Sequence, residues 1–458
     1  MRHGTRIACT TALLLTLTTA PAATATAADT DPTHVDGQLP SGATYMMDVP
    51  TNWNGTVLLF SHGYNAGPAN PAQDAPDAAT KPLLLQQGYA LIGSSYASTG
   101  WAVTDAVPDQ MATLKAFTTR FGQASRTLAW GRSYGGLVTT AIAERHPDAI
   151  DGSLSMCGLV HGGVANWNNT LDPVFALKTL LGSDVPLVNL PTQQAATDAA
   201  NTLTAKVDSA QSTPEGRARI ALAAALHNIP VWNAPTQTRP TTNDWDTQQA
   251  NQYDAVKGLL KIAAFNRRQE AETRAGGNMS WNTGVDYTRL LAQSSVRKEV
   301  TALYKKAGLS LTKDLTALNR APRITADPAA VAWMSSTSSF TGKLAKPQLS
   351  IHTIGDPLVP VQTESALRRA VTAAGSAPLL RQAYVDNAGH CTFSPAEQLA
   401  ALHTLEDRVA TGTWQGTDPA SLNTRATAAD PTTPTRYVSY RPTPYLRPYD
   451  LAHPSDGR

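Results

Sequence analysis

One six-residue stretch, residues 131–136 with the sequence Gly-Arg-Ser-Tyr-Gly-Gly, constrains the possible folds of this chain more than any other. It follows an apolar run at residues 127–130 and opens a segment, residues 137–145, whose apolar residues have helical spacing. Between a strand and a helix, a G-x-S-x-G turn exposes its serine, and the flanking glycines let neighbouring backbone approach closely. Because a chain of this length contains the pattern by chance roughly one time in seven, the surrounding segments must support it. We predict that Ser133 stands exposed above a parallel sheet.

Strand-like and helix-like segments alternate on both sides of this turn. Apolar runs typical of strands buried on both faces lie at residues 56–60, 89–95, 127–130, 151–159, 348–354 and 381–385. Helical spacing of apolar residues is found at residues 79–87, 105–121, 137–145, 363–374 and 395–409. This alternation predicts an α/β protein with a mostly parallel, doubly covered sheet that binds ligands at the carboxyl ends of its strands.

The alternation of strands and helices is interrupted between the two parts of the sheet pattern. There, residues 165–325 consist of long helical segments joined by turns. We interpret this stretch as a helical cap inserted over the active end of the sheet, with a separate linked domain as the alternative. The core then has two parts, residues 29–164 and 326–412. A proline-rich arm, residues 413–458, follows and either packs on the body or forms a loose tail.

The first residues have the features of a secretory signal peptide. Arg2 and Arg6 precede a short apolar run at residues 12–17 and an alanine-rich stretch at residues 23–27. The apolar run is far shorter than the roughly 20 residues that a membrane span needs. We predict that residues 1–28 are removed, that the protein is secreted, and that it has no membrane partner.

Charge argues against nucleic acid as a partner, because 37 Lys and Arg residues face 35 Asp and Glu residues and no basic run exceeds a pair. Cleavage of the signal removes Cys9 and leaves Cys157 and Cys391, which either pair in an oxidising compartment or remain as two buried thiols. The chain has no C-x-x-C or H-E-x-x-H spacing, so we expect no metal and no cofactor.

Three residues occur in the order nucleophile, acid and histidine, namely Ser133, Asp356 and His390, each after a predicted strand. A serine needs a base within hydrogen-bond reach to act as a nucleophile. His390 would accept the Ser133 proton, and Asp356 would orient His390 and stabilise its imidazolium form. Singly, such an aspartate is more often a turn residue and such a histidine is more often inert. Together, in this order and on these elements, the three residues indicate a serine hydrolase.

Two backbone amides are candidates for the oxyanion hole, those of Tyr64 and Tyr134. Tyr134 directly follows Ser133, and Tyr64 follows the pair His62-Gly63 at the end of a predicted strand. Backbone N–H groups in these two places stabilise the tetrahedral intermediate in many serine hydrolases. For the His62 side chain we expect a bracing role within the loop.

The motifs around these residues resemble those of α/β-hydrolases over residues 43–160 and 345–411. The stretch Gly-Asp-Pro-Leu-Val-Pro around Asp356 and the Ala-Gly-His stretch that ends at His390 are similar to the acid and histidine loops of that superfamily. The resemblance implies the α/β-hydrolase fold with an inserted cap and the catalytic roles given above. The pair His390-Cys391 is also similar to tannases and fungal-type feruloyl esterases, in which this cysteine bonds to one that precedes the serine; here Arg132 stands before Ser133.

Topology suggests another partner for the cysteine that follows the histidine. The strand that ends near Cys157 is expected beside the strand that precedes Ser133, and the histidine loop must reach over the same edge of the sheet. We therefore predict a disulfide between Cys157 and Cys391, whose Cα atoms must then lie about 4.4 to 6.8 Å apart.

The function indicated is that of a secreted serine hydrolase that cleaves carboxylic esters of small molecules, including aromatic, feruloyl-type esters, through an acyl-enzyme. Candidates for apolar walls of the site are Trp101, Trp232, Trp281 and Tyr134, with core packing as the alternative for the tryptophans. Asn278 and Trp281 in the glycine-containing segment 276–284, together with His161, are candidate substrate contacts. The alternatives are a serine exopeptidase or aminopeptidase of the same fold, and a non-catalytic binding protein on a hydrolase scaffold.

Overall fold

A single sheet of nine strands organises the residues that the structure describes, which are residues 1, 3 and 32–452 of this computed structural model. The predicted signal peptide, residues 1–28, lies almost wholly outside the described residues. The description below concerns the compact unit that begins at Pro32. In spatial order its strands are β1 (Thr33–Gln38), β2 (Thr44–Val49), β4 (Ala90–Ser94), β3 (Thr56–Ser61), β5 (Arg126–Arg132), β6 (Gly152–Met156), β7 (Gln348–Gly355), β8 (Leu380–Ala388) and β9 (Tyr437–Val438).

The middle of the sheet is parallel and its edges are antiparallel. Strands β4, β3, β5, β6, β7 and β8 run in the same direction. Strands β1 and β2 at one edge and β9 at the other run against their neighbours. This confirms the predicted mostly parallel sheet. Because parallel strands end at the same edge, the residues that follow β3, β5, β6, β7 and β8 are brought together there.

Strand β3 illustrates why the sheet must be covered on both faces. All six of its residues are buried. Val57 and Leu59 pack into the apolar cluster that contains helices α2 (Val103–Phe121) and α3 (Tyr134–Arg145). Leu58 and Phe60 point the other way, into the cluster that contains α1 (Thr80–Gln86) and α14 (Pro395–Thr411). Since burial of such a side chain contributes about 1.5 to 3 kcal/mol, neither face is stable without its helices.

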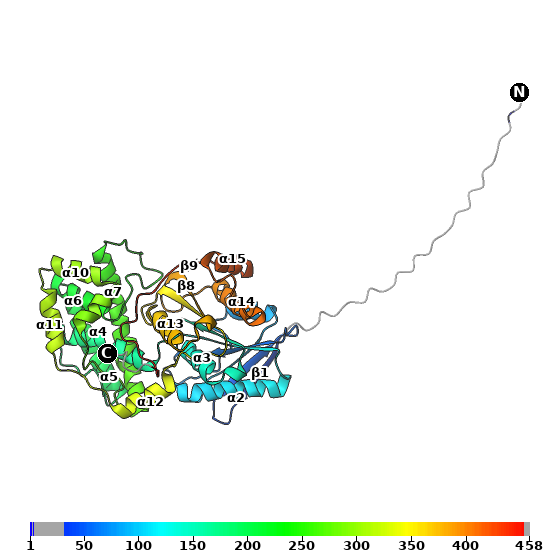
Figure 1. Ribbon diagram of the computed structural model, residues 1–458, viewed down its shortest axis with the longest axis horizontal. Coiled ribbons are helices and arrows are strands. Elements are labelled where there is room, and N and C mark those ends of the chain that lie inside the picture. Colours follow the sequence, from blue (N-terminus) through cyan, green and yellow to red (C-terminus); the bar gives the residue numbers. More distant parts are fainter. Residues whose placement is uncertain (2, 4–31, 453–458) are drawn as a thin grey trace. The chain divides into compact units, whose positions relative to one another are not determined.

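The two helical layers complete the core (Figure 1). Helix α13 (Thr363–Ala373) joins α2 and α3 on one face, and α15 (Pro419–Ala429) joins α1 and α14 on the other. Short 3-10 turns precede two of the strands, η1 (Pro147–Ala149) before β6 and η3 (Ala377–Leu379) before β8. None of the helices in the described part of the chain combines the length and the apolar character that crossing a bilayer requires.

Helices alone make up the regular structure between β6 and β7. They are α4 (Gly163–Leu180), α5 (Gln193–Gln211), α6 (Pro214–Ala225), α7 (Trp245–Leu259), η2 (Leu260–Arg267), α8 (Arg268–Ala275), α9 (Tyr287–Gln293), α10 (Arg297–Lys306), α11 (Leu311–Arg320) and α12 (Pro328–Ser338). Most of them share an apolar cluster that is separate from the two clusters of the sheet. Figure 1 shows this helical group, in green, gathered beside the sheet. Helix α6 begins as its sequence suggests, with Thr213 as the N-cap and Pro214 at the first position.

Helices α7, η2 and α8 follow one another without a break, and the middle piece, η2, is a π-helix. Wide turns of this kind are rare and occur often at functional sites. Arg267 is the last residue of η2.

The segment after residue 413 contains regular structure. Asp418 caps a helix, α15, which has Pro419 at its first position and buries Leu422 and Ala426. Strand β9 then pairs with β8 and adds an edge to the sheet. Proline at the first helical position is compatible with a helix, so a high proline content alone did not predict the local structure.

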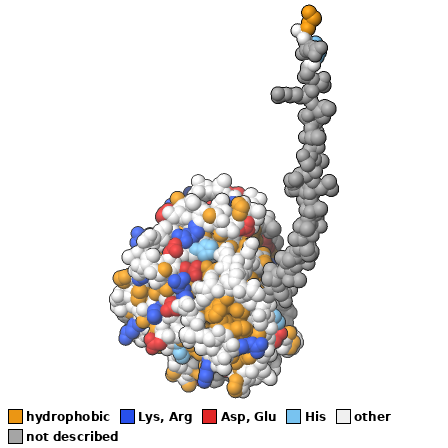
Figure 2. All heavy atoms as spheres, turned by 90° about the vertical axis from the view of Figure 1, so that its right-hand side faces the viewer, with side chains coloured by type: hydrophobic (Ala, Val, Ile, Leu, Met, Phe, Trp, Pro, Cys, Tyr) orange, Lys and Arg blue, Asp and Glu red, His pale blue; other side chains and the backbone are white. Residues whose placement is uncertain are grey.

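On the face shown in Figure 2, acidic and basic side chains are interspersed with apolar ones.

Candidate active site

Ser133 occupies the sharp turn between β5 and α3, with φ 59° and ψ −122°. Such a conformation is strained for a residue with a side chain, and it is found where surrounding structure imposes it. The flanking glycines are required by close packing. A Cβ atom on Gly131 would lie 2.3 Å from the carbonyl oxygen of Gly135, and one on Gly135 would lie 1.8 Å from the carbonyl oxygen of Ser61. The turn therefore has the geometry of the nucleophile elbow that the sequence predicts.

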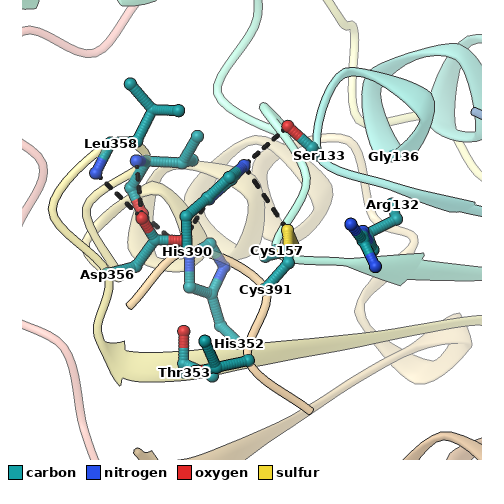
Figure 3. Close-up of a disulfide and its surroundings, with 12 residues drawn as sticks. Arg132, Ser133, Gly136, Cys157, His352, Thr353, Asp356, Leu358, His390 and Cys391 are labelled. Carbon is teal, nitrogen blue, oxygen red and sulfur yellow. Dashed lines mark hydrogen bonds and ion pairs between the residues drawn. A yellow bond between two sulfur atoms is a disulfide. The ribbon is translucent and has the colours of Figure 1, made fainter. Parts of the chain in front are cut away.

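The structure brings the three residues of the predicted triad together (Figure 3). The Nε2 atom of His390 lies 2.6 Å from the Ser133 hydroxyl, and Nδ1 lies 2.6 Å from Oδ2 of Asp356. Asp356 is fully buried, and its Oδ1 accepts the backbone N–H groups of Leu358 and Val359 at 2.9 Å each. Since a carboxylate only accepts, Nδ1 of His390 donates to it and Nε2 is free to accept from Ser133.

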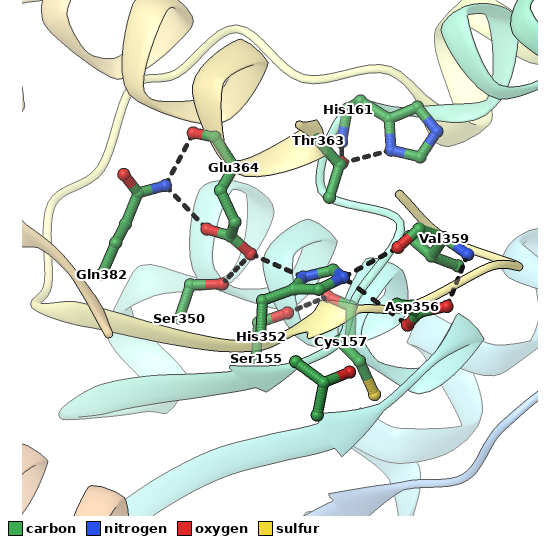
Figure 4. A network of polar contacts seen from close by, with 12 residues as sticks. Ser155, Cys157, His161, Ser350, His352, Asp356, Val359, Thr363, Glu364 and Gln382 are labelled. Carbon is green, nitrogen blue, oxygen red and sulfur yellow. Dashed lines mark hydrogen bonds and ion pairs between the residues drawn. The ribbon is translucent and has the colours of Figure 1, made fainter. Parts of the chain in front are cut away.

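A second histidine lies behind Asp356 (Figure 4). The Nε2 atom of His352 lies 2.9 Å from the carbonyl oxygen of Val359 and 3.6 Å from Oδ2 of Asp356, and Nδ1 lies 3.1 Å from Oε1 of Glu364. Both ring nitrogens therefore face oxygen atoms, an arrangement that favours the doubly protonated imidazolium. Glu364 is held in turn by the Ser350 hydroxyl at 2.7 Å and the Gln382 amide at 2.6 Å.

The pKa values of this buried group agree with the geometry. Burial disfavours the charged form of His352, but the carboxylates of Asp356 and Glu364 outweigh it and raise the pKa of His352 to about 10. Burial likewise disfavours ionised Asp356, but His390 and His352 on its two sides outweigh that effect and lower the pKa of Asp356 to about 2. Asp356 is thus a carboxylate at any pH near neutrality.

The predicted disulfide between Cys157 and Cys391 is confirmed, with a Cα–Cα distance of 5.4 Å. Cys157 directly follows β6, the strand next to β5, and Cys391 follows His390. The Sγ atom of Cys391 lies 3.4 Å from Nε2 of His390 (Figure 3). The bond therefore ties the histidine loop to the end of β6. The two sulfurs and His390 also lie close enough to share an ion, but sulfurs bonded to each other are not the thiolates that bind metals.

The backbone amides of Tyr64 and Tyr134 lie beside Ser133. Tyr134 is the first residue of α3, so its N–H has no partner within the helix. The Tyr64 N–H donates no hydrogen bond to any residue that the structure describes. A Cβ atom on Gly63 would lie 3.7 Å from the Cβ of Ser133, which places the loop with Tyr64 directly against the serine. Both groups are available to an oxyanion at this position.

A pocket with aromatic walls opens at Ser133 under the helical group. Its walls include Tyr64, Trp101, Tyr134 and Trp167, and η2 closes it with Ala263 and Arg267. The aromatic rings contact one another in a chain, since Tyr134 lies edge-on to Tyr64 and to Trp101, and Trp101 contacts Trp167. A second space, a larger and more open groove, adjoins Ser133 on the side of His390 and Arg132. Ser133 therefore lies between an aromatic inner pocket and an open outer groove.

Three predicted substrate contacts lie away from this pocket, as does Trp232. Asn278 uses its side-chain amide to bind the carbonyl groups of Ser280 and Thr325. The ring of Trp281 packs against Tyr449. His161 contacts the Thr363 hydroxyl, and burial lowers the pKa of His161 to about 3.

Trp232 lines a different cavity, which adjoins Asp356 rather than Ser133. None of these four side chains lines the space at Ser133. No residue of segment 276–284 lines the pocket or the groove at Ser133. The segment is instead bonded to α4, where the Trp281 N–H donates to the Asn168 side chain at 2.9 Å.

Trp167 and Arg267 are among the pocket residues that were not predicted from the sequence. Trp167 lies in α4, the first helix after β6, and Arg267 lies in η2. The sequence offers one weak indication for Trp167, which is its position shortly after a strand of the core. Arg267 has none, because an arginine in a helical segment is usually exposed to solvent.

Comparison with known proteins places the chain in a family. A family model for the alpha/beta hydrolase fold matches residues 56–396. The chain is 30% identical over 429 residues to an o-phthalyl amidase of Xanthobacter agilis, with 88% of this chain and 93% of that protein covered. The chain therefore belongs to the α/β-hydrolase superfamily and is a hydrolase.

Solved structures of esterases and peptidases are also similar. Feruloyl esterase B from Aspergillus oryzae is 15% identical with a TM-score of 0.40, and the match covers 84% of this chain and 81% of that one. An acylaminoacyl peptidase from Pyrococcus horikoshii is 10% identical with a TM-score of 0.36, over 82% of this chain and 41% of that one.

Proposed function

We propose that this protein is a secreted serine hydrolase that cleaves a carboxylic ester or amide of a small aromatic acid through an acyl-enzyme. The observation that carries the proposal is the pair of hydrogen bonds that links Asp356 to His390 and His390 to Ser133, each at 2.6 Å, beside an aromatic pocket.

Acylation begins with attack of the Ser133 oxygen on the substrate carbonyl carbon. His390 takes the hydroxyl proton at Nε2 as the new C–O bond forms, and Asp356 stabilises the imidazolium at Nδ1. The amides of Tyr64 and Tyr134 donate to the oxyanion. His390 then returns the proton to the leaving alcohol or amine as its bond to carbon breaks, which leaves the acyl group on Ser133.

Deacylation repeats these steps with water. His390 takes a proton from water, the hydroxide attacks the acyl carbon, and the proton passes to the Ser133 oxygen as the acid leaves. His390 lines the outer groove and does not line the inner pocket. Because His390 must reach both the leaving group and water, both use the groove, and the acyl group occupies the aromatic pocket.

Two observations bear on the kind of bond. The relative that is 30% identical is named an o-phthalyl amidase, which supports amides of an aromatic acid as substrates. The same residues hydrolyse esters, which have better leaving groups, so esters of the same acid are expected to react as well. Aromatic walls formed by Trp101, Tyr134 and Trp167 favour an aryl acyl group, including the feruloyl type.

A serine aminopeptidase would need an acidic group to bind the free α-amino group of a peptide. Among the described residues, the walls of the inner pocket and the outer groove contain no aspartate or glutamate. They contain instead two arginines, Arg132 and Arg267. The charge of the site is therefore opposite to that which the aminopeptidase function requires.

Secretion forms part of the proposal. The signal-like sequence of residues 1–28 and the disulfide between Cys157 and Cys391 both support an oxidising, extracytoplasmic location. Expression of the full chain followed by amino-terminal sequencing of the protein from the medium tests it. We expect cleavage after Ala27 or Ala28, and an uncleaved protein that stays inside the cell would contradict it.

Activity is tested with a fluorophosphonate probe and a panel of p-nitrophenyl esters, aryl anilides and aminoacyl anilides. We expect the probe to label the protein at Ser133 and the aryl esters and anilides to be cleaved. Labelling should be lost in Ser133→Ala. A correctly folded protein that neither reacts with the probe nor cleaves any substrate would instead support a binding protein on this scaffold.

A further inference from the structure

Arg267 is a cation without a protein partner in the wall of the inner pocket. Among the residues that the structure describes, its guanidinium donates no hydrogen bond and forms no ion pair; it lies over the ring of Tyr64, with its Cζ 4.5 Å from the ring centroid. Burial lowers the pKa of Arg267. An arginine nevertheless remains charged near neutral pH. The pocket thus contains a partly buried positive charge on a residue that lines the same space as Ser133.

The neighbours of Arg267 show how unusual this is. Arg268, the next residue, is fully buried but donates to the Ser280 hydroxyl at 2.6 Å and to the Trp167 carbonyl at 2.9 Å. Arg274, about two helical turns beyond Arg267, pairs with Glu270. Buried charges in proteins are normally paired in this way, because loss of hydration is otherwise uncompensated.

Glu270 is the acid that could have paired with Arg267, and it is used elsewhere. It accepts the Tyr64 hydroxyl at 3.0 Å and the Trp101 backbone N–H at 2.9 Å. These bonds hold α8 against two walls of the pocket and occupy the carboxylate with partners other than Arg267. The structure therefore keeps an acid close to the pocket and still leaves Arg267 without an ion pair.

We propose that Arg267 binds a carboxylate on the acyl part of the substrate. This inference rests on the proposed function. A guanidinium forms two parallel hydrogen bonds with a carboxylate, and the surrounding low polarity strengthens them. Arg267 and Ser133 line the same pocket as Trp101, Tyr134 and Trp167. The preferred substrates are therefore monoamides and monoesters of an aromatic dicarboxylic acid.

The acyl side, rather than the leaving group, carries this carboxylate because of where His390 lies. The leaving group must receive its proton from His390, which faces the outer groove. Arg267 lines the groove as well, but Trp101, Tyr134 and Trp167 line only the inner pocket, so an aryl acyl group held by these rings shares that pocket with Arg267. An anion bound there remains in place while the acyl group is attached to Ser133. Arg267 thus selects the acid and holds it through both steps.

The test compares matched anilides of p-nitroaniline. The acyl groups are benzoyl, benzoyl with a ring carboxylate in the ortho, meta or para position, and the same rings with a neutral carboxamide in place of the carboxylate. For the wild-type protein we expect kcat/KM for the best carboxylate isomer to exceed that for benzoyl and for its carboxamide by about 100-fold, which is typical for a buried charge pair. The advantage should arise mainly in KM.

Variants identify the residue responsible. Arg267→Gln should remove the 100-fold preference, because it should lower kcat/KM for the carboxylate anilide far more than kcat/KM for the benzoyl anilide. Arg267→Lys keeps the charge but not the paired hydrogen bonds, so it should retain part of the preference. Lys261→Gln is the matched control, since Lys261 is exposed on the same π-helix and does not line the space at Ser133. It should keep the full preference.

The outcomes separate this inference from the proposed function. Wild-type protein that cleaves benzoyl and carboxybenzoyl anilides equally well, or an Arg267→Gln variant that loses both activities together while folded, would overturn the role of Arg267 and leave the hydrolase intact. If no anilide or ester is cleaved, the proposed function fails, and calorimetry of aromatic dicarboxylates against benzoate on Ser133→Ala still tests Arg267. Equal affinity for the two acids would then overturn it. If Arg267→Gln does not fold, an Arg267→Met variant replaces it in the same comparison, and an unchanged preference in that variant would overturn the role of Arg267.

Discussion

Replacing His352 with glutamine removes a buried cation from between two carboxylates. In the wild-type protein, His352 donates to the Val359 carbonyl at 2.9 Å and to Glu364 at 3.1 Å, and lies 3.6 Å from Asp356. A glutamine can replace at most one of these hydrogen bonds and none of the charge. Removing one partner of a buried ion pair typically costs about 3 to 5 kcal/mol of unfolding free energy.

The pKa of His352 gives an independent magnitude. Its value is about 10 in the folded protein against 6.5 in a model peptide. Between these values the folded state holds a proton that the unfolded state has lost, so the stabilisation is complete below about pH 6.5 and falls as pH rises through 10. Over the whole window this amounts to about 5 kcal/mol, and within it the free energy of unfolding falls by about 1.4 kcal/mol per pH unit.

Urea unfolding at pH 7.5 and pH 9 measures this slope. We expect the wild-type protein to lose about 2 kcal/mol between these two values through His352. The His352→Gln variant should be less stable at pH 7.5 and should lack that loss, so the difference between the two proteins isolates His352 from any other group that titrates in the range. Loss of this cation should also raise the pKa of Asp356. The acidic limb of the kcat/KM profile should therefore lie at higher pH in the variant than in the wild-type protein.

His403→Gln is the control, because burial lowers the pKa of His403 and keeps it neutral in both states above pH 7. It should show the wild-type slope. A wild-type protein whose stability is unchanged between pH 7.5 and pH 9 would refute the charge assigned to His352, even if His352→Gln failed to fold. An equal slope in wild type and His352→Gln would refute it as well.

Three further predictions concern the residues around Ser133. Ser133→Ala should lower kcat by about 10⁶-fold with an unchanged urea midpoint, and steady-state activity above about one thousandth of wild type would contradict the assigned nucleophile. Asp356→Asn should lower kcat by about 10⁴-fold, because the amide favours the wrong tautomer of His390; if Asp386→Asn is the more damaging change, Asp356 is not the acid. Reduction of the Cys157–Cys391 disulfide, which closes a loop with a sequence separation of 234 residues, should lower activity before it unfolds the protein, with typically about 2 to 4 kcal/mol of stability lost. Full activity of the reduced, folded protein would show that the bond does not position His390.

The order of elements and the triad could be predicted because their signals are local. Buried parallel strands are short apolar runs, and the residues after them meet at one edge whatever the chain does between. Ser133, Asp356 and His390 each follow such a run. The close approach of Gly135 to the Ser61 carbonyl shows why the elbow must carry glycine at that position, and a fixed requirement of this kind leaves a recognisable motif.

The substrate-binding side chains could not be predicted, because packing within the helical group determines which way each of them points. Trp281 and Arg267 both lie in that group, and neither has a local signal for the direction it faces. Trp281 packs on Tyr449 near the other end of the chain, whereas Arg267 reaches the pocket from a π-helical turn that shifts its direction relative to a regular helix. His352 was missed for a similar reason, since its partner Glu364 lies in the following helix, α13.

The two cations near the triad affect catalysis differently. His352 lies behind Asp356 and does not line the pocket or the groove, so its charge is the same with and without substrate. It keeps Asp356 ionised at every stage. Arg267 lines the space into which substrate binds, so its surroundings differ with and without substrate. A carboxylate on the acyl group contacts Arg267 in the bound substrate and in the transition state alike, and such uniform binding lowers KM without raising kcat. A charge-bearing acyl group should therefore lower KM and leave kcat nearly unchanged, whereas an uncharged aryl group of the same shape should not gain this lower KM.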